Sequence, residues 1–305
     1  MKQVDRMKQL AEANSSWLNR RFGGTEYLSP EYYAQILKPY CFKGVSDLGM
    51  FRAFLDKYDH NVGPKILELG SGSGRATDVL VKHSLAKNAS IELLDLSAQM
   101  LDASIRKYGV RPDFKYIHAD TINYLLSNRD SYDLIFSLWS FSHSVHQTLH
   151  ALGESKGCEV ILAAMKNLFT RSLSVNGRAF IVHFDALSEE QIISLSIRRT
   201  KYPFFVPGQQ SPSKKMLDQM LIGLSKQGLV RFRVLKHTGD AIKYSSINEA
   251  LEIFFNFHME CEFNQKENIS DLLHDVKQQL LRFRDDRGSI RIKPKCFVYE
   301  VTRTK

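Results

Sequence analysis

A short glycine-rich segment carries the strongest chemical signal in the sequence. Residues 68–74 read Glu-Leu-Gly-Ser-Gly-Ser-Gly and join an apolar run to a segment with helical spacing. Three glycines allow a tight turn and let a ligand approach the backbone without interference from a Cβ atom. The next apolar run ends at Asp95, 21 residues after Gly74 (95 − 74 = 21), where a carboxylate can accept both hydroxyls of a ribose. The pattern predicts a ligand that contains a nucleoside.

Two nucleoside cofactors fit such a turn, NAD and S-adenosylmethionine. The dinucleotide fingerprint is G-x-G-x-x-G, whereas this turn reads G-x-G-x-G and has Arg75 where the third glycine would stand. Glu68 lies two residues before the first glycine, and its carboxylate would repel a pyrophosphate but attract the ammonium group of a methionine moiety. Spacing and charge therefore favour S-adenosylmethionine, with S-adenosylhomocysteine as the product, over an NAD-dependent enzyme.

Alternating strand and helix patterns surround this turn. Apolar runs typical of buried strands occupy 64–70, 90–96, 114–120, 131–140 and 177–185, and helical patterns occupy 75–86, 97–109 and 160–173. Such alternation predicts a parallel sheet with helices on both faces. The order changes near the end, with a helix at 217–228, a strand at 229–240, helices at 247–260 and 269–283, and a strand at 293–303. Seven strands are expected in all.

Composition narrows the class of protein further. A chain of 305 residues with 43% hydrophobic and 25% charged residues can bury a sizeable core, which argues against a disordered or coiled-coil protein. The formal charge of +9 permits an anionic partner without requiring one. Four cysteines without a C-x-x-C pair favour a reducing, cytoplasmic location. No apolar run reaches about 18 residues, so no membrane span is expected. Nothing in the sequence requires a dimer, so a monomer is the default expectation.

The glycine turn, the acid at position 95 and the late helix–strand additions resemble the class I S-adenosylmethionine-dependent methyltransferases, chiefly over residues 64–185. The resemblance implies a Rossmann-like, doubly wound α/β fold whose seven-stranded, mostly parallel sheet has an antiparallel last strand. Residues 1–60 read as a helical cap or lid, and residues 61–305 as the methyltransferase domain. Insertions at about 186–216 and 241–292 are expected to form the substrate cover.

The resemblance also implies roles for individual cofactor-binding residues. The glycine turn would line the methionine part, and Asp95 would bind the ribose. Asp120 would bind the adenine amine, Met100 would pack on the adenine ring, and Leu138 would lie near the sulfonium. The residues expected to contact the cofactor are Glu68, Gly70, Ser71, Gly72, Asp95, Leu96, Met100, Asp120, Thr121, Ser137 and Leu138.

The segment after the fourth strand indicates the class of methyl acceptor, because in this family it faces the transferable methyl group. It lacks the Asn/Asp-Pro-Pro-aromatic run of nucleobase-amine methyltransferases, the Pro-Cys of cytosine C5 methylation and the paired-glutamate loop of arginine methyltransferases. These absences favour a small molecule and disfavour a nucleic-acid partner, although the charge of +9 leaves RNA open. The short N-terminal region and residues 248–264 resemble histamine N-methyltransferase in layout, but Phe141, Ser142 and His143 stand where that enzyme has paired tyrosines.

Two histidines are the candidate catalytic residues. His143 is the first candidate for a general base, because it follows the strand end that faces the cofactor and imidazole titrates near neutral pH. His146 is the second, and a structural role stays open for both. A neutral amine needs only alignment, whereas a hydroxyl acceptor needs the base. Together with His150 they share one helical face, but no carboxylate partner accompanies them, so no metal is expected.

Aromatic and polar side chains from several segments are predicted to enclose the acceptor. The basic and aromatic run at 198–205 suits an acidic acceptor, whereas Glu262 among aromatic rings suits a cationic amine, so the sign of the acceptor charge stays open. The residues predicted to bind the substrate are Tyr27, Tyr32, Trp139, His183, Phe205, Phe257, His258 and Glu262.

Together these features predict an S-adenosylmethionine-dependent methyltransferase with a small-molecule acceptor. N-methylation of an amine is placed ahead of O-methylation with His143 as base. The alternatives are an RNA or protein methyltransferase that uses the basic surface, and a cofactor-binding partner subunit without activity of its own.

Overall fold

A computed structural model describes residues 37–58, 64–199, 202–258 and 269–305. Most of the predicted helical cap over residues 1–60 therefore lies outside the described residues, together with Tyr27, Tyr32 and Glu262. Within the described ranges, no helix has both the length and the apolar character that crossing a bilayer would require.

Seven strands form the central sheet in the order β5-β4-β3-β6-β7-β11-β8. Their bounds are Lys65–Leu69 (β3), Ser90–Asp95 (β4), Phe114–His118 (β5), Tyr132–Leu138 (β6), Leu173–Phe184 (β7), Val230–Thr238 (β8) and Lys295–Arg303 (β11). Strands β3 to β7 pair in parallel, and β11 lies antiparallel between β7 and β8. The predicted seven-stranded, mostly parallel sheet with an antiparallel last strand is confirmed.

Strand order reverses beside β3, and this reversal positions the site. The chain proceeds outward from β3 through β4 to β5, then returns to place β6 on the other side of β3. Ile66 of β3 accordingly pairs with Ile91 on one side and with Leu134 on the other. The connections that follow β3 and β6 leave the sheet in opposite directions, which opens a crevice at the carboxyl ends of the strands.

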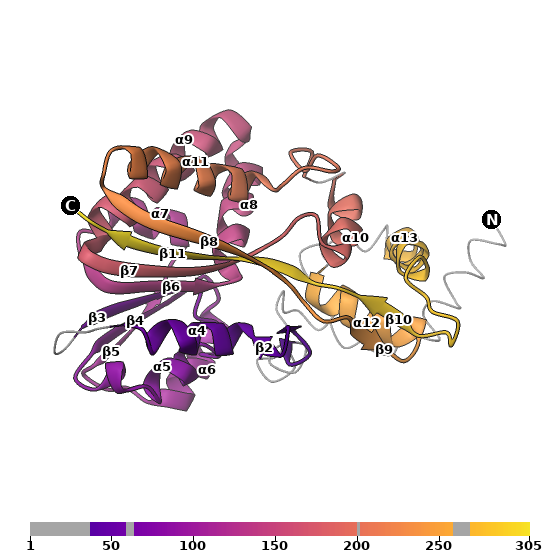
Figure 1. Cartoon of the computed structure of the whole chain (residues 1–305), viewed down its shortest axis with the longest axis horizontal. Helices are drawn as coiled ribbons and strands as arrows, with labels where there is room; N and C mark the ends of the chain where they lie inside the picture. Colours follow the sequence, from indigo (N-terminus) through magenta and orange to yellow (C-terminus); the bar gives the residue numbers. More distant parts are fainter. Residues whose placement is uncertain (1–36, 59–63, 200–201, 259–268) are drawn as a thin grey trace.

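Helices cover both faces of the sheet (Figure 1). One face carries α4 (Asp47–Leu55), α5 (Thr77–Val81) and α6 (Ala98–Tyr108), and the other carries α7 (Thr121–Ser127), α8 (Ser140–Leu152), α9 (Glu154–Asn167) and α11 (Pro212–Lys226). Strand residues alternate between the two layers, so Phe136 enters the apolar cluster on the α4 side and Ile135 the cluster on the α9 side. A short 3-10 turn, η1 (Ser84–Ala86), follows α5, and a π turn, η2 (Leu168–Ser172), follows α9.

Several helix predictions required correction. Helix α7 was not anticipated; it begins after Asp120, whose side chain accepts a hydrogen bond from the backbone N–H of Asn123 at 2.8 Å. This N-cap satisfies one of the amides that lack an intrahelical partner. The helix expected at 160–173 begins earlier, at Glu154, and the one expected at 75–86 ends at Val81.

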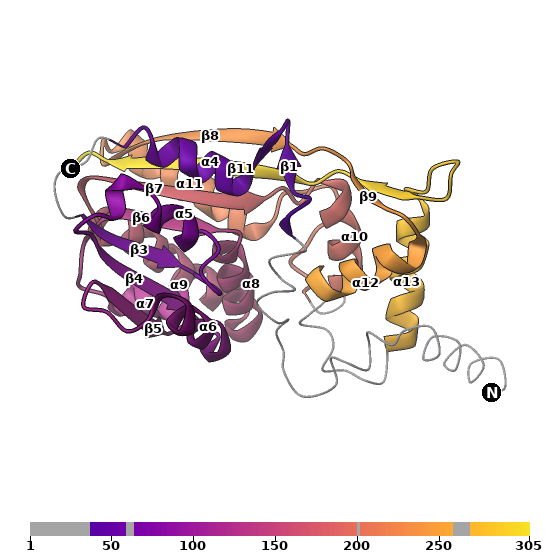
Figure 2. The same ribbon diagram turned by 90° about the horizontal axis from the view of Figure 1, so that it is seen from below.

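The two insertions meet beyond the end of the sheet. The first contains α10 (Glu189–Arg198), and the second contains β9 (Ile242–Tyr244), α12 (Ile247–His258), α13 (Ile269–Leu281) and β10 (Ile290–Ile292). Strands β9 and β10 pair as a ribbon that extends the line of β8 and β11, and α13 packs against both α10 and α12 (Figures 1 and 2). A hairpin of β1 (Cys41–Phe42) and β2 (Val45–Ser46) lies where the ribbon leaves the sheet. The Asp240 N–H there donates a hydrogen bond to the Cys41 carbonyl at 2.7 Å.

Phe51 provides a test of how α4 is held on the sheet. Its side chain is fully buried, with its ring centroid 4.5 Å from that of Phe136 and 5.4 Å from that of Phe180. We expect Phe51→Ala to lower the free energy of unfolding by about 3–5 kcal/mol, since it removes apolar contacts and leaves a cavity. Val110→Ala, at a position that is 90% exposed, should change it by less than about 0.5 kcal/mol in urea titrations. Equal losses in the two variants would contradict this packing.

Candidate functional site

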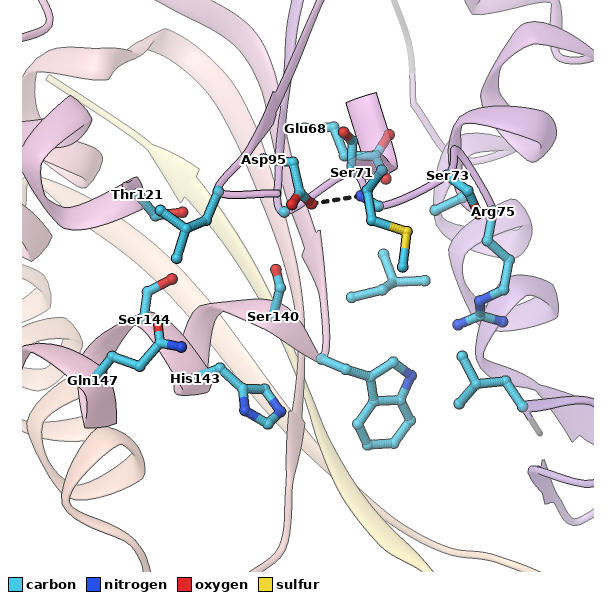
Figure 3. A pocket seen from close by; sticks show the side chains of 18 residues that line it. Glu68, Ser71, Ser73, Arg75, Asp95, Thr121, Ser140, His143, Ser144 and Gln147 are labelled. Carbon is cyan, nitrogen blue, oxygen red and sulfur yellow. Dashed lines mark hydrogen bonds between the residues drawn. The ribbon is translucent and has the colours of Figure 1, made fainter. Parts of the chain in front are cut away.

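A cavity of about 170 Å³ opens at the carboxyl ends of β3, β4 and β6, where the strand order reverses (Figure 3). Its walls come from the glycine turn after β3, the ends of β4 and β6, and the first turns of α7 and α8. Most of the predicted cofactor-binding residues line it, namely Glu68, Gly70, Ser71, Gly72, Asp95, Leu96, Met100, Thr121 and Leu138.

The glycine turn is held in place from both sides. The N–H groups of Gly70 and Ser71 donate to the carbonyl of Leu94 in β4, at 2.8 and 2.9 Å. On the other side, the hydroxyls of Ser137 and Ser140 donate to the carbonyl of Leu69, at 2.9 and 2.7 Å. Gly70 has a φ of +73°, and a Cβ atom there would collide with the Ser140 side chain. Glycine is therefore required at this position on both conformational and steric grounds.

Asp95 ends β4 with its carboxylate against the glycine turn. Its Oδ2 accepts from the Gly72 N–H at 2.7 Å (Figure 3). Its Oδ1 accepts from the Ser97 N–H at 2.8 Å. Burial raises the pKa of the Asp95 carboxyl, while these two N–H groups favour the charged form and oppose that rise. Each oxygen keeps a further lone pair, so the carboxylate can accept hydrogen bonds from a pair of ligand hydroxyls.

Glu68 is a buried acid beside the same turn. The Thr77 hydroxyl donates to its Oε2 at 2.5 Å. Burial raises the pKa of Glu68 to about 8, the Thr77 hydrogen bond opposes this, and the nearby Asp95 charge adds to it. The carboxyl is therefore mainly protonated at neutral pH in the ligand-free protein. A cationic group in the cavity would favour its ionised form.

Helix α8 contributes cavity residues that were not anticipated, among them Ser144 and Gln147. They line the cavity beside the predicted His143, with the predicted Thr121 of α7 on the same side (Figure 3). The glycine-turn residue Arg75 and the first α8 residue, Ser140, were likewise not predicted as cavity residues. The spacing of His143 and Gln147, four residues apart on one helical face, was the available signal for α8.

Trp139 connects β6 to α8 in an unusual conformation. Its φ of +71° is left-handed, which is uncommon for a bulky side chain and concentrates at functional sites. Its backbone N–H donates to the Val182 carbonyl at 2.9 Å, and its indole Nε1 donates to Asp47 Oδ2 at 2.6 Å. The ring lines the cavity, the placement expected for a substrate-binding residue.

The two candidate catalytic histidines lie in different environments. His143 is exposed and lines the cavity. His146 lies instead in a buried aromatic cluster, with its ring centroid 4.7 Å from that of Phe205 and 6.0 Å from that of Phe204. Burial lowers the pKa of His146 well below its usual value. The two side chains point to different sides of the helix, and His146 does not line the cavity. A catalytic role for His146 would require it to do so.

Four other predicted site residues also lie away from the cavity lining. His183 is buried, with Nδ1 2.7 Å from the Phe184 carbonyl oxygen and Nε2 2.8 Å from Ser213 Oγ, and burial lowers its pKa to about 4. Phe205 packs on His146. The remaining two have structural hydrogen bonds described above: the N-cap residue Asp120 and the loop-anchoring Ser137. Of the other predicted substrate residues, Phe257 and His258 belong to α12, and Tyr27, Tyr32 and Glu262 are outside the described residues.

The described residues contain no group of three or more histidine, cysteine, aspartate or glutamate side chains arranged to hold a metal ion. The arrangement at the cavity is a buried carboxyl, Glu68, and a half-buried one, Asp95, beside a backbone turn, faced by an imidazole and an indole. It can bind a ligand that carries both a cation and a diol, and it can accept a proton at His143.

The raised pKa of Glu68 makes stability depend on pH. The folded protein keeps the proton up to about pH 8, whereas an unfolded chain loses it near the usual value of 4.5. This stabilisation is complete below about pH 4.5 and is lost as the pH rises through 8. Relative to Glu68→Gln, which does not titrate, wild type should lose up to about 1.4 kcal/mol of unfolding free energy per pH unit between about pH 5 and 8. Urea titrations at several pH values measure this, and parallel curves for the two proteins would contradict it.

The sequence of the site region is similar to known methyltransferases. Residues 66–156 match the methyltransferase domain family. Malonyl-[acyl-carrier protein] O-methyltransferase 1 of Ilyobacter polytropus is 37% identical over 76 residues, which cover 25% of this chain and 27% of that protein. The chain thus matches about a quarter of the length of this curated relative.

Two solved structures are similar to this chain, and the first of them shares its fold. The YcgJ protein from Bacillus subtilis has a TM-score of 0.50 with 12% identity, over 85% of this chain and 98% of that chain. A putative methyltransferase from Bacillus halodurans has a TM-score of 0.49 with 11% identity, over 85% of this chain and 99% of that chain. The matched range, 66–156, contains the glycine turn, Asp95 and the cavity face of α8. Residues 66–156, which hold most of the cavity lining, are therefore similar to methyltransferase domains, for which S-adenosylmethionine is the methyl donor and S-adenosylhomocysteine is its product.

Proposed function

We propose that this protein transfers a methyl group from S-adenosylmethionine to a small-molecule acceptor, with an amine nitrogen as the first candidate. The observation that carries the proposal is the carboxylate of Asp95 against the Gly72 N–H, beside the buried carboxyl of Glu68. One turn thus holds a carboxylate that can accept hydrogen bonds from a diol, Asp95, and a carboxyl that can face a cation, Glu68. S-adenosylmethionine carries both complementary groups, a ribose and an ammonium.

The cavity residues divide the cofactor among them by chemistry. Asp95 accepts hydrogen bonds from the ribose hydroxyls, and Glu68 faces the ammonium of the methionine part. Met100 and Leu96, at the start of the next connection, offer apolar surface for the adenine ring. When bound, the cofactor supplies an electrophilic methyl group on its sulfonium. The protein contributes by holding donor and acceptor in line, which alone can account for a large part of the rate.

The acceptor end lies after β6. Leu138 and Trp139 provide apolar walls there, and His143 is the titratable side chain on the adjoining turn of α8. An amine acceptor must lose its own proton before attack, and the neutral lone pair then needs only alignment. The helical cap over residues 1–60 and the insertions at about 186–216 and 241–292 are proposed to cover this end, with the protein acting as a cytoplasmic monomer. The small cavity favours a small molecule over a polymer.

O-methylation is the second candidate. His143 lies where a base would have to remove the proton of a hydroxyl acceptor. The name of the curated relative, an O-methyltransferase, supports the same reading.

Calorimetric titration with S-adenosylhomocysteine tests the cofactor assignment. We expect micromolar binding to wild type, and binding weaker by about ten- to a hundredfold in Asp95→Ala, because a charge-assisted pair of hydrogen bonds is lost. Asp102→Ala is the matched control, since Asp102 is exposed on α6 and does not line the cavity. Equal affinity in wild type and Asp95→Ala would refute the ribose contact, and no binding to wild type would refute the proposed function.

The effect of His143→Gln on kcat, compared between amine and hydroxyl acceptors, distinguishes N- from O-methylation. For acceptors found by screening amines first and then alcohols and acids, we expect His143→Gln to lower kcat less than about tenfold for an amine. For a hydroxyl acceptor the loss should be about 10²- to 10⁴-fold, since the base is removed. His150→Gln, an exposed position on the same helix outside the cavity lining, is the control. A hydroxyl acceptor that is methylated equally fast by His143→Gln would eliminate His143 as base.

A further inference from the structure

A buried carboxylate behind one wall of the cavity has no role in the scheme above. Asp47, the first residue of α4, is 1% exposed and does not line the cavity itself. Both of its oxygens are engaged by side chains that do line the cavity. The Arg75 guanidinium forms a two-pronged ion pair with it, with Nη1 3.0 Å from Oδ1, and the indole Nε1 of Trp139 donates to Oδ2 at 2.6 Å. Oδ1 also accepts from the Leu48 N–H at 2.8 Å.

The contact with Trp139 fixes the ring at the acceptor end. Behind the ring, Phe42 stacks at a centroid distance of 6.3 Å and Tyr40 meets it edge-on at 6.1 Å. These apolar contacts do not satisfy the indole N–H, whereas Asp47 does. Since the Trp139 backbone is already left-handed, the hydrogen bond to Asp47 selects the side-chain orientation that closes the cavity wall.

The contact with Arg75 sets the charge of the same wall. Among the described residues that line the cavity, Arg75 is the one arginine or lysine. It also lines a second hollow of about 410 Å³ between α4 and α5, so its side chain forms part of the partition between the two spaces. An Arg75 without a counter-ion would repel a cation bound at the glycine turn. The buried Asp47 carboxylate neutralises it.

We propose that Asp47 is a positioning residue that orients Trp139 and neutralises Arg75, and that it thereby lets the cavity accept a sulfonium cation. The inference rests on the proposed function, and it identifies a carboxylate outside the cavity as a determinant of affinity for the cofactor. S-adenosylmethionine carries one positive charge more than S-adenosylhomocysteine, at the sulfur. Loss of Asp47 must therefore penalise the methyl donor more than the product.

Three variants separate the hydrogen bond from the charge. The sequence has two tryptophans, Trp17 and Trp139, so Trp17→Phe makes Trp139 the sole indole fluorophore. In that background, Asp47→Ala removes both functions, whereas Asp47→Asn keeps an oxygen acceptor for the indole and removes the charge. Asp56→Ala, at the exposed end of the same helix, is the matched control. Circular dichroism confirms that each variant is folded at the assay temperature.

Two readouts are expected to respond differently. Without ligand, the Trp139 emission should shift to longer wavelength in Asp47→Ala and stay near the parent value in Asp47→Asn and Asp56→Ala. In calorimetry, both Asp47 variants should lose about tenfold more affinity for S-adenosylmethionine than for S-adenosylhomocysteine. Arg75→Gln added to Asp47→Ala should restore the ratio of the two affinities, because the unbalanced charge is then gone.

The outcomes that overturn the proposal are separate from those that overturn the methyltransferase activity. Unchanged emission in Asp47→Ala refutes the positioning of Trp139. An unchanged ratio of affinities for the two ligands in both Asp47 variants refutes the charge role. If the parent binds neither ligand, the proposed function is wrong and the charge role falls with it, while the ligand-free emission of Asp47→Ala still decides whether Asp47 orients Trp139.

Discussion

The close approach of the glycine turn to the start of α8 is the constraint on which the site depends. At the reversal of strand order, β4 and β6 flank β3, and both of them hold the turn that leaves it. The Leu94 carbonyl binds the N–H groups of Gly70 and Ser71, and the hydroxyls of Ser137 and Ser140 bind the Leu69 carbonyl. A side chain at position 70 would force α8 away. The cavity, its polar lining and the position of His143 all follow from this contact.

Charge is the second organising principle of the site. Two acids are held beside the turn, Glu68 buried and Asp95 half-buried, and burial raises the pKa of each. A buried carboxyl is costly unless a partner compensates it, and here hydrogen bonds from Thr77 and from backbone amides do so in part. A cationic ligand would relieve the remaining cost. Asp47, which lies outside the cavity, also favours a cationic ligand, because it neutralises the positive charge of Arg75.

Helix α8 links the cavity to the far side of the domain. Its exposed His143 lines the cavity, while Val145 and Leu149 pack into the apolar layer and His146 joins the aromatic cluster of Phe184, Phe204 and Phe205. That cluster includes part of the first insertion. The orientation of α8, and with it His143, therefore depends on packing contributed by residues about 60 positions later in the chain (204 − 143 = 61).

Local patterns were sufficient for the strands, the glycine turn, Glu68 and Asp95, because each is defined by neighbours along the chain: an apolar run, a tight turn, an acid at the end of the next strand. They predicted a seven-stranded sheet, and the alternation of strands and helices predicted its parallel part. Helices α7 and α8 were not among the predicted helices: α7 is only seven residues long, and α8 begins after Trp139, which makes no side-chain capping hydrogen bond.

The side-chain environments depended on tertiary structure. His143 and His146 have the same chemistry and lie three residues apart, yet a rotation of the helix exposes one to the cavity and buries the other. Asp47 stands 28 residues before Arg75 and 92 before Trp139, so no local pattern could pair them. The sequence determined which ligand chemistry the turn can accept, because that depends on backbone freedom and on one nearby acid. Which side chains face that ligand was decided by the packing of helices on the sheet, because burial and distance in space have no local signature.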